Sequence, residues 1–378
     1  FGEATAFNSD IGDWDVSNVT NMNSLFYGTN YNQNLSNWCV SNISNTPSQF
    51  GGSFANNNSP VWGTCPRPLT NKVYFDNGTC KCPNATVGDS SWINGTVYTA
   101  VNNSTIAGEI ANGNYNLCTT LVTNMSALFK DNHSFNSNIG FWDTSNVINM
   151  SWMFSNARAF NQNISNWDVS KVTNMSYLFH HARAFNQNIG NWDVSKVMNM
   201  SYLFSNAYLF NQDIGSWDTS SVTNMTDLFA SAFVFNQDIS LWNTSSVTSM
   251  LGTFGGARAF NQPVGGWNTS NVTNMYFTFA SAYAFNQYIG DWDVSSVTNM
   301  GGMFDGARDY DQDMTKWCVS QFSSEPNGFS FNNSMSNSNK PIWGTCPVVQ
   351  DYTGPTISSV VVTATSLDIT NSPQILTI

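Results

Sequence analysis

The chain has 378 residues, of which only 10% are charged, and its formal net charge is −12. With 12 Lys plus Arg, such an acidic chain is a poor partner for nucleic acid or an anionic membrane surface. No stretch approaches the roughly 18 apolar residues that a membrane helix needs. The 41% hydrophobic fraction, with 14 Trp and 27 Phe, is enough for a core and argues against disorder. Composition therefore predicts a folded chain with no nucleic-acid partner and no membrane span.

Residues 1–66 duplicate the end of a longer array downstream. AFNSDIGDWDVSNVTNM (6–22) matches AFNQYIGDWDVSSVTNM (284–300), and NWCVSNIS (37–44) matches KWCVSQFS (316–323). In both copies a Cys replaces the Asp after the last Trp, and a second Cys follows an irregular loop. We therefore predict the disulfides Cys39–Cys65 and Cys318–Cys346, each closing an exposed C-terminal rung and contributing about 3–4 kcal/mol. Residues 1–66 are interpreted as the last rungs and cap of a first solenoid.

Residues 67–120 are predicted to form the opening cap of a second solenoid. KVYFDNGTCKC and INGTVYTAV are typical of strands, the second with a turn at Asn94–Gly95, and STIAGEIANG is typical of a short helix. Cys118 is expected to pair with Cys82, or else with Cys80. We take Cys80 as the remaining thiol, either free or bridging to another chain.

Residues 121–347 are predicted to form the second solenoid with its C-terminal disulfide cap, and their 25-residue repeat runs without insertions as far as Trp317. The recurring positions begin at Phe135, Trp142 and Met150, and they continue to Tyr310, Trp317 and Met300. Within one unit, Met200, Leu203, Phe204 and Ala207 have the spacing of one helix face, and 194–199 resembles a short strand. The predicted fold is a repeat solenoid with a leucine-rich-repeat-like short strand and short helix per rung, disulfide-closed caps and a β-rich tail.

Two kinds of polar residue repeat with the same step. Asn–Gln pairs such as Asn186–Gln187, and Asn residues such as Asn199, are interpreted as ladders that satisfy backbone groups, with a row of ligand-binding amides as the alternative. The Asp after each Trp is replaced by Asn243 and Asn268 in two rungs, which favours a turn-forming role. We expect no cofactor, with calcium along the Asp column as the alternative.

Residues 348–378 are predicted to be a linker followed by β-strands. TISSVVVTATSLDITNSPQILTI (356–378) alternates and is rich in β-branched residues, but it holds too few strands to fold alone. It is either part of a truncated domain or a donor strand that pairs with another subunit.

Sequons for N-glycosylation are frequent throughout the chain. The candidates in caps and loops are Asn57, Asn77, Asn84, Asn94, Asn102, Asn132 and Asn332. Those in the rungs are Asn124, Asn149, Asn174, Asn199 and Asn224, where the Asn can equally serve the turn alone.

Signs of catalysis or metal binding are missing from the sequence. The three histidines, His133, His180 and His181, do not recur between rungs and are interpreted as surface variation. There is no CxxC pair, no His near a Cys, and no nucleophile or phosphate-binding motif in a supporting context. We therefore expect no enzyme, no catalytic residue and no metal site. The cysteine pattern favours an extracellular or cell-surface location.

The unit FNQNISNWDVSKVTNMSYLF (160–179), repeated in phase, resembles the BspA-type leucine-rich-repeat surface proteins. The resemblance covers residues 1–45 and 119–320. It implies a secreted or cell-surface protein with a role in adhesion or surface layers, and it supplies no catalytic residues.

Two functions follow as hypotheses. The first is a structural subunit that self-associates into a surface filament or layer through end-to-end and strand-addition contacts. The alternative is an adhesin that binds host or environmental glycans or proteins, with sugars stacking on aromatics such as Tyr177, Tyr202, Phe277 and Tyr283. Ice or mineral binding by the Thr, Ser and Asn rows is a weaker alternative.

Overall fold

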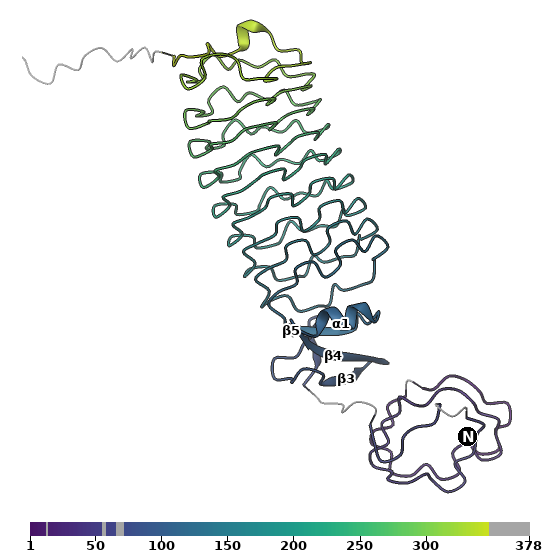
Figure 1. Ribbon diagram of the computed structural model, residues 1–378. Coiled ribbons are helices and arrows are strands. Elements are labelled where there is room, and N and C mark those ends of the chain that lie inside the picture. Colours follow the sequence, from purple (N-terminus) through teal and green to yellow (C-terminus); the bar gives the residue numbers. More distant parts are fainter. Residues whose placement is uncertain (13, 55–57, 66–71, 348–378) are drawn as a thin grey trace, which may run out of the picture. The chain divides into compact units, whose positions relative to one another are not determined.

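The computed structural model of the chain describes residues 1–12, 14–54, 58–65 and 72–347 (Figure 1). The chain divides into a large unit, Phe1–Cys346, and a second unit, Pro347–Ile378. The predicted tail strands over 356–378 lie outside the described residues. No helix in the described ranges has both the length and the apolar character needed to cross a membrane.

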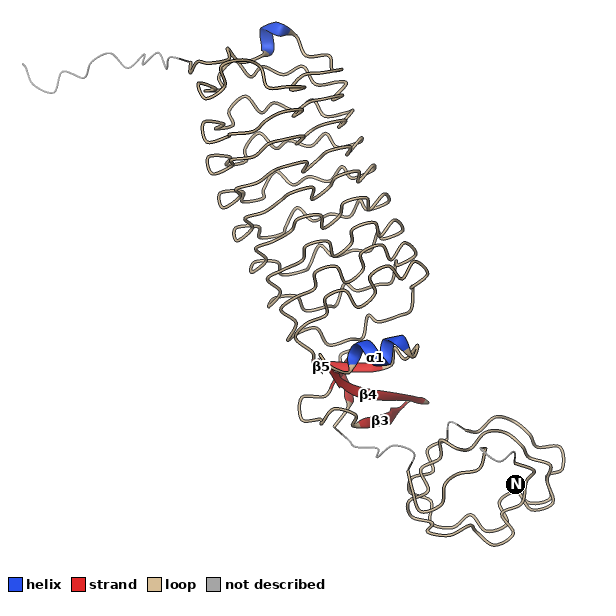
Figure 2. Cartoon of the chain, in the orientation of Figure 1, coloured by secondary structure: helices blue, strands red, loops and turns tan. Residues whose placement is uncertain are grey.

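The central feature is a long stack of 25-residue rungs, drawn almost entirely as loop (Figure 2). Parallel bridges join equivalent residues of successive rungs, from Asn124–Asn149 through to Asn274–Asn299. Alternate N–H groups donate to the rung that follows. These bonds run from Met200 to Asn224 (3.1 Å), from Tyr202 to Thr226 (2.8 Å) and from Phe204 to Leu228 (2.9 Å). The backbone is therefore satisfied between rungs, as in a sheet, although no rung holds a strand longer than one bridge.

The outward side of each rung is a series of turns, which differs from the predicted short helix. In the segment 200–207, the N–H groups of Leu203, Ser205 and Ala207 bond three residues back. Tyr202 and Asn206 have φ of 58° and 59°, values that a right-handed helix does not admit. The same two positions are left-handed in each rung from 127 to 306. The left-handed residues turn alternate N–H groups toward the next rung, so the inter-rung bonds replace helical ones.

The core consists of columns of identical side chains. Phe179 and Phe204 are stacked at 5.8 Å, and the parallel column pairs Phe185 with Phe210 at 6.0 Å. The Trp residues that recur every 25 residues from Trp167 to Trp317 are buried, and each donates its Nε1–H to the preceding rung, as Trp192 does to the Ile164 carbonyl (3.2 Å). Each rung thus buries its apolar residues only against its neighbours, which is the property expected of a repeat array. The relation to leucine-rich repeats stays a prediction.

The opening cap is the one part of the described chain rich in regular elements. Strands β1 (Tyr74–Asp76) and β2 (Thr79–Lys81) form a hairpin, and β3 (Ser90–Ile93), β4 (Thr96–Asn102) and β5 (Leu117–Leu121) form a sheet. β4 runs antiparallel to β3 and parallel to β5, and the helix α1 (Ile106–Ala111) lies between β4 and β5 in sequence. Asn94 and Gly95 both have positive φ, which explains the tight β3–β4 turn expected from the sequence.

The C-terminal end of the stack is closed by a change in packing. Phe329 meets Phe304 edge-on, with an interplanar angle of 83°, so the column of stacked rings ends there. The Val319 N–H donates to the Thr345 carbonyl at 2.9 Å, and the short 3₁₀ helix η1 (Asn337–Asn339) crosses the end of the stack. The Cys318–Cys346 disulfide fixes this cap, as predicted.

The block 1–65 has a hydrophobic core of its own. Phe26 stacks on Tyr31 at 4.3 Å, and its N–H donates to the Phe50 carbonyl at 2.7 Å. The predicted Cys39–Cys65 disulfide is present. This block therefore repeats the rung chemistry and the disulfide closure of the long stack.

Candidate functional site

The Asn–Gln columns form continuous amide ladders. The Asn161 Oδ1 accepts the Asn186 N–H (2.9 Å) and the Gln187 Nε2–H (2.9 Å), and the Asn186 Oδ1 accepts the Asn211 N–H (3.0 Å) in turn. Likewise, the Asn199 Oδ1 accepts the Ser201 N–H at 3.0 Å. The structural interpretation of these columns is confirmed, because their oxygens are engaged within the stack.

The Asp column forms turns in the way the sequence predicts. The Asp193 Oδ1 accepts the Ser195 N–H at 3.0 Å, and Asn243 makes the equivalent bond to Ser245 at 3.1 Å. Hydrogen bonds from the Ser195 side chain and from the Ser195 N–H lower the pKa of Asp193. Among the residues that the structure describes, no group of three or more His, Cys, Asp or Glu side chains could hold a metal ion.

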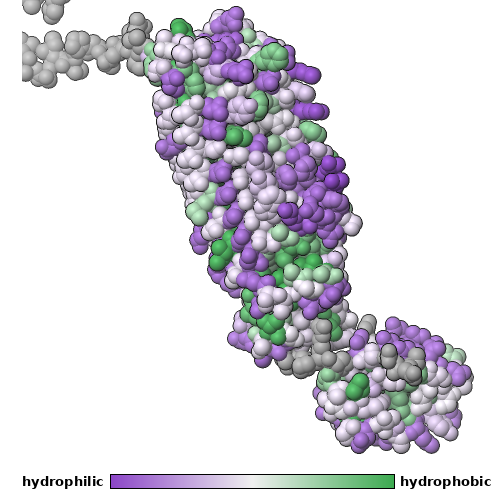
Figure 3. Space-filling model, viewed as in Figure 1, coloured by the Kyte–Doolittle hydropathy of each residue, from purple (hydrophilic) through white to green (hydrophobic). Residues whose placement is uncertain are grey.

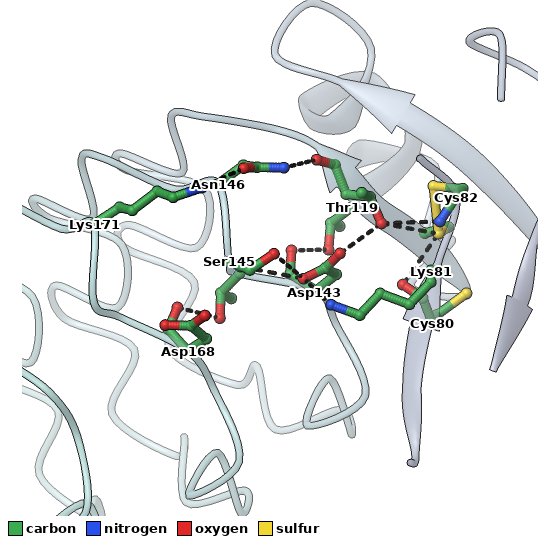
Figure 4. A network of polar contacts seen from close by, with 12 residues as sticks. Cys80, Lys81, Cys82, Thr119, Asp143, Ser145, Asn146, Asp168 and Lys171 are labelled. Atoms are coloured by element: carbon green, nitrogen blue, oxygen red, sulfur yellow. Dashed lines mark hydrogen bonds and ion pairs between the residues drawn. A yellow bond between two sulfur atoms is a disulfide. The ribbon is translucent and has the colours of Figure 1, made fainter. Parts of the chain in front are cut away.

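Asp143, the first member of that column, has a different role at the opening cap (Figure 4). Its carboxylate receives the Lys81 ammonium at 2.9 Å and the Thr120 hydroxyl at 2.7 Å, and its side chain is 2% exposed. Burial raises the pKa of Asp143, but the hydrogen bonds from Lys81, Thr120 and Ser145 outweigh burial and lower it. The site is a clamp between β2, β5 and the first rung, and the sequence pattern did not single it out.

Three cysteines lie in the opening cap, close to the contact between Lys81 and Asp143. Cys82 pairs with Cys118, the first of the two predicted alternatives, and Cys80 is the free thiol. Cys80 is fully buried, its N–H donates to the Phe141 carbonyl (2.8 Å), and burial raises the pKa of its thiol to about 12. A bridge from Cys80 to another chain would first require this cap to open.

In the aromatic column of Trp152, Tyr177 and Tyr202, the ring of Tyr177 is covered on both faces. Tyr177 lies between Trp152 (3.7 Å) and Tyr202 (4.3 Å), with all three rings nearly parallel. The Lys130 ammonium covers Trp152 at 4.4 Å. The expectation that Tyr177 stacks on a glycan is therefore disfavoured, because its neighbours already occupy both faces.

His180 lies beside this column. Its Nδ1 is 3.3 Å from the Ser155 hydroxyl, but Ser155 is only 2% exposed. Burial and the nearby His181 lower the pKa of His180 to about 4, so its imidazole is uncharged at neutral pH. We interpret the contact between His180 and Ser155 as a structural hydrogen bond, because the Ser155 hydroxyl is buried and a substrate could not reach it.

A cleft of about 610 Å³ opens at the C-terminal end of the stack. Aromatic and polar side chains line it together, with Tyr276, Phe277 and Phe331 facing Asn299 and Asn327. Unlike the rings of the Tyr177 column, the Phe331 ring has no partner among the described aromatic rings, and the residue is 61% exposed. The cleft therefore brings apolar ring faces and amide groups together at one place on the surface.

Two glycines in the wall of the cleft lack the side chains that an earlier rung has at the same positions. Gly301 and Gly302 stand where an earlier rung has Ser201 and Tyr202, and both line the cleft. The Phe277 ring lies over Gly302, where a Cβ would be 2.0 Å from its Cε1 atom. Phe277 is among the aromatic residues that the sequence suggests for sugar binding, but Phe331 is not, because it lies outside the repeat. The break in the repeat at Gly301–Gly302 is the sequence signal that marks the position of the cleft.

The sequons divide by exposure. In the cap and loops, Asn77, Asn84, Asn94 and Asn332 are exposed, whereas Asn102 and Asn132 are half-buried. Of the rung sequons, Asn124 is exposed and the other four are half-buried. Asn57 lies outside the described residues. Glycosylation at all of these positions stays a prediction, and the exposed loop sequons are the more accessible ones.

On the face drawn in Figure 3, hydrophobic residues form separate patches among polar ones.

Comparison with known proteins gives one family: a sequence model described as Mycoplasma protein of unknown function, DUF285, matches residues 1–62, 98–207, 186–269 and 239–343. No curated protein and no solved structure matches the chain. The matched segments together span most of the repeats.

Proposed function

The chain belongs to the family of Mycoplasma proteins of unknown function, DUF285, and from that premise we propose that it is an extracellular binding module that holds an uncharged glycan in the cleft beside Phe331. The observation that carries the proposal is the combination of the uncovered Phe331 ring with amide side chains in one cleft. The C–H groups of a sugar ring pack on an aromatic face. The Asn299 Oδ1 already accepts the Gly301 N–H, so the Asn299 Nδ2–H groups and the Asn327 amide are the groups that pair with the sugar hydroxyls. The predicted disulfides support an oxidising, extracellular setting.

The rigidity of the stack supports the same function. A binding site costs less conformational entropy when its walls are already ordered. The cleft lies beside the closed end of the core, where Phe329 and the Cys318–Cys346 disulfide hold the cap against the last rung.

The proposal is tested by glycan-array screening followed by calorimetry with the uncharged oligosaccharide that binds best. We expect Phe331→Ala to weaken binding about 10-fold or more, in line with the loss of a central aromatic contact. Leu241→Ala is the matched control, because Leu241 is 87% exposed and does not line the cleft. Equal affinity of the Phe331→Ala variant, or no uncharged glycan bound by the native chain, would exclude the cleft as a glycan site.

A filament subunit is the competing proposal. Its support is the repetitive, modular chain, but the buried Cys80 does not offer a thiol for a bridge between subunits in the native cap. The strands predicted over 356–378 lie outside the described residues. Electron microscopy of native material distinguishes the two, since a filament subunit gives ordered fibres and a binding module gives discrete particles. Ice or mineral binding has less support, because hydroxyls such as those of Thr248 and Thr273 donate to the preceding rung.

A further inference from the structure

One position of the repeat carries all of the arginines that the structure describes. Arg158, Arg183, Arg258 and Arg308 occupy the same place in their rungs. Aromatic residues fill this place in the rungs between them, at Tyr208, Phe233 and Tyr283. We call these seven residues the arginine stripe. In a chain with a net charge of −12, this concentration of positive charge at one repeat position needs a physical explanation.

Most of the stripe is a continuous stack of guanidinium groups and rings. Arg183 lies over Tyr208 (5.1 Å), and Tyr208 stacks on Phe233 (4.6 Å). Arg258 lies over Phe233 (4.4 Å) on one side and over Tyr283 (5.4 Å) on the other. Arg308 covers the remaining face of Tyr283 at 4.1 Å. Cation–π contacts therefore hold the guanidinium groups in a row along the rungs.

The donors of these guanidinium groups have no protein partners among the described residues. A guanidinium donates within its plane, so stacking its face on a ring leaves its N–H edge available to an anion. Arg183, Arg258 and Arg308 form no ion pair with a described carboxylate, and the Arg183 Nε is shielded from solvent without a hydrogen-bond partner. Arg158 differs, because its Nε donates to Asn156 at 2.9 Å.

Acidic residues are kept away from the middle of the stripe. The segments around the stripe position contain no Asp or Glu in the six rungs that include 155–159 through 280–284. Asp131 lies at one end, where it accepts a bond from Asn156, and Asp305 and Asp309 lie at the other end beside Arg308. The charges of Arg183 and Arg158 contribute, after burial, to a lowered pKa of His181, which is consistent with a positive local potential.

We propose that the arginine stripe is a docking surface for the carboxylate groups of an extended acidic polysaccharide. Charge complementarity selects an anion, and the guanidinium fork matches a carboxylate in two parallel hydrogen bonds. Successive rungs are about 4.8 Å apart, and the four arginines are one, three and two rungs apart, so their charges are spaced about 5, 14 and 10 Å along a line, which fits a linear polymer better than a compact ligand. Nucleic acid is disfavoured as the occupant, because its affinity depends on many more cationic contacts than an acidic chain offers.

The test uses polygalacturonate fragments as the probe and the methyl-esterified polymer as an uncharged control. We expect binding of the acidic polymer, weakening with added salt, and a loss of affinity of about 10-fold or more in Arg258→Gln/Arg308→Gln. Lys171→Gln/Lys196→Gln removes the same charge from exposed lysines at another repeat position, and we expect less than about a 2-fold effect from it.

Further variants and ligands distinguish recognition of carboxylates by arginine from general charge attraction and from binding in the cleft. Arg258→Lys/Arg308→Lys keeps the charge but removes the fork, so we expect an intermediate loss. Phe331→Ala should leave polygalacturonate binding unchanged, which makes failure here distinguishable from failure of the cleft. Equal binding of the esterified polymer, equal losses in the arginine and lysine variants, no binding at all, or tighter binding of single-stranded poly(dT) would each overturn the proposal.

Discussion

The Lys81 ammonium lies 2.9 Å from the Asp143 carboxylate, and this pair joins the opening cap to the first rung. Asp143 is almost fully buried, whereas Lys81 keeps about a quarter of its side chain exposed. We expect Asp143→Ala to lower the free energy of unfolding by about 3–5 kcal/mol, because it leaves the ammonium and Thr120 without their acceptor. Urea denaturation measures this change.

The control for Asp143 is Asp193→Ala, which removes an exposed turn-forming carboxylate from the same column. We expect this substitution to cost only about 0.5–1.5 kcal/mol. Equal costs at the two positions would show that Asp143 is only another turn residue.

The same carboxylate predicts a dependence of stability on pH. Its pKa is lowered in the folded chain, so its contribution is complete above the ordinary Asp value of about 3.9 and is lost as pH falls through the folded pKa. The difference in unfolding free energy between the native chain and Asp143→Asn should therefore shrink below about pH 4. Val222→Ala, a buried change without a titrating group, should give a difference that does not vary with pH. A constant difference for Asp143→Asn would contradict the prediction.

The amide ladder predicts that the stability of the stack depends on the Oδ1 acceptor of each ladder Asn more than on whether that side chain is charged. Asn186→Ala removes the acceptor of two bonds from the next rung, and we expect a loss of about 1–3 kcal/mol. Asn186→Asp keeps that oxygen, as Asp311 does at the same position near the C-terminal end, and should cost less than the Ala variant. Thermal unfolding of both variants decides, and a larger loss for Asp than for Ala would exclude the ladder as the cause.

A side chain at Gly302 is expected to destabilise the fold, because it would collide with the Phe277 ring in the wall of the cleft. Its φ is 61°, and a Cβ there would collide with the Phe277 ring, so Gly302→Ala should destabilise the chain by about 1–2 kcal/mol or more. Gly266→Ala should lie within about 1 kcal/mol of the native chain, because no atom lies within 4 Å of the added Cβ and φ is not left-handed. Similar melting temperatures for the two variants would argue against the described packing of Phe277.

Cys80 predicts slow reaction with alkylating agents in the native chain. With a pKa of about 12, on the order of 1 thiol in 10,000 is ionised at pH 8, and the side chain is buried as well. Without reductant, mass spectrometry should detect one iodoacetamide adduct after denaturation and almost none before it. Rapid native labelling, or a disulfide-linked dimer through Cys80, would instead support the bridge between chains.

The sequence by itself determined the period, the columns and the two disulfides that close the C-terminal ends, whereas the structure decided between Cys82 and Cys80 as the partner of Cys118. The 25-residue step is uninterrupted, so equivalent residues must meet in successive rungs, and Phe185 and Phe210 stack as a consequence. The duplicated Cys positions in 37–66 and 316–347 identified Cys39–Cys65 and Cys318–Cys346 because the same loop had to close the same kind of end.

Only the tertiary structure decided the path of the chain within a rung and the surfaces that remain free. The spacing of Met200 and Phe204 suits a helix, but bonds to the next rung favour turns with left-handed residues at Tyr202 and Asn206. The Asp143–Lys81 pair joins residues 62 apart, which no local pattern encodes. Which rings stack on their neighbours and which stay uncovered, as Phe331 does, depends on side-chain geometry between rungs, and it is this geometry that locates the candidate binding surfaces.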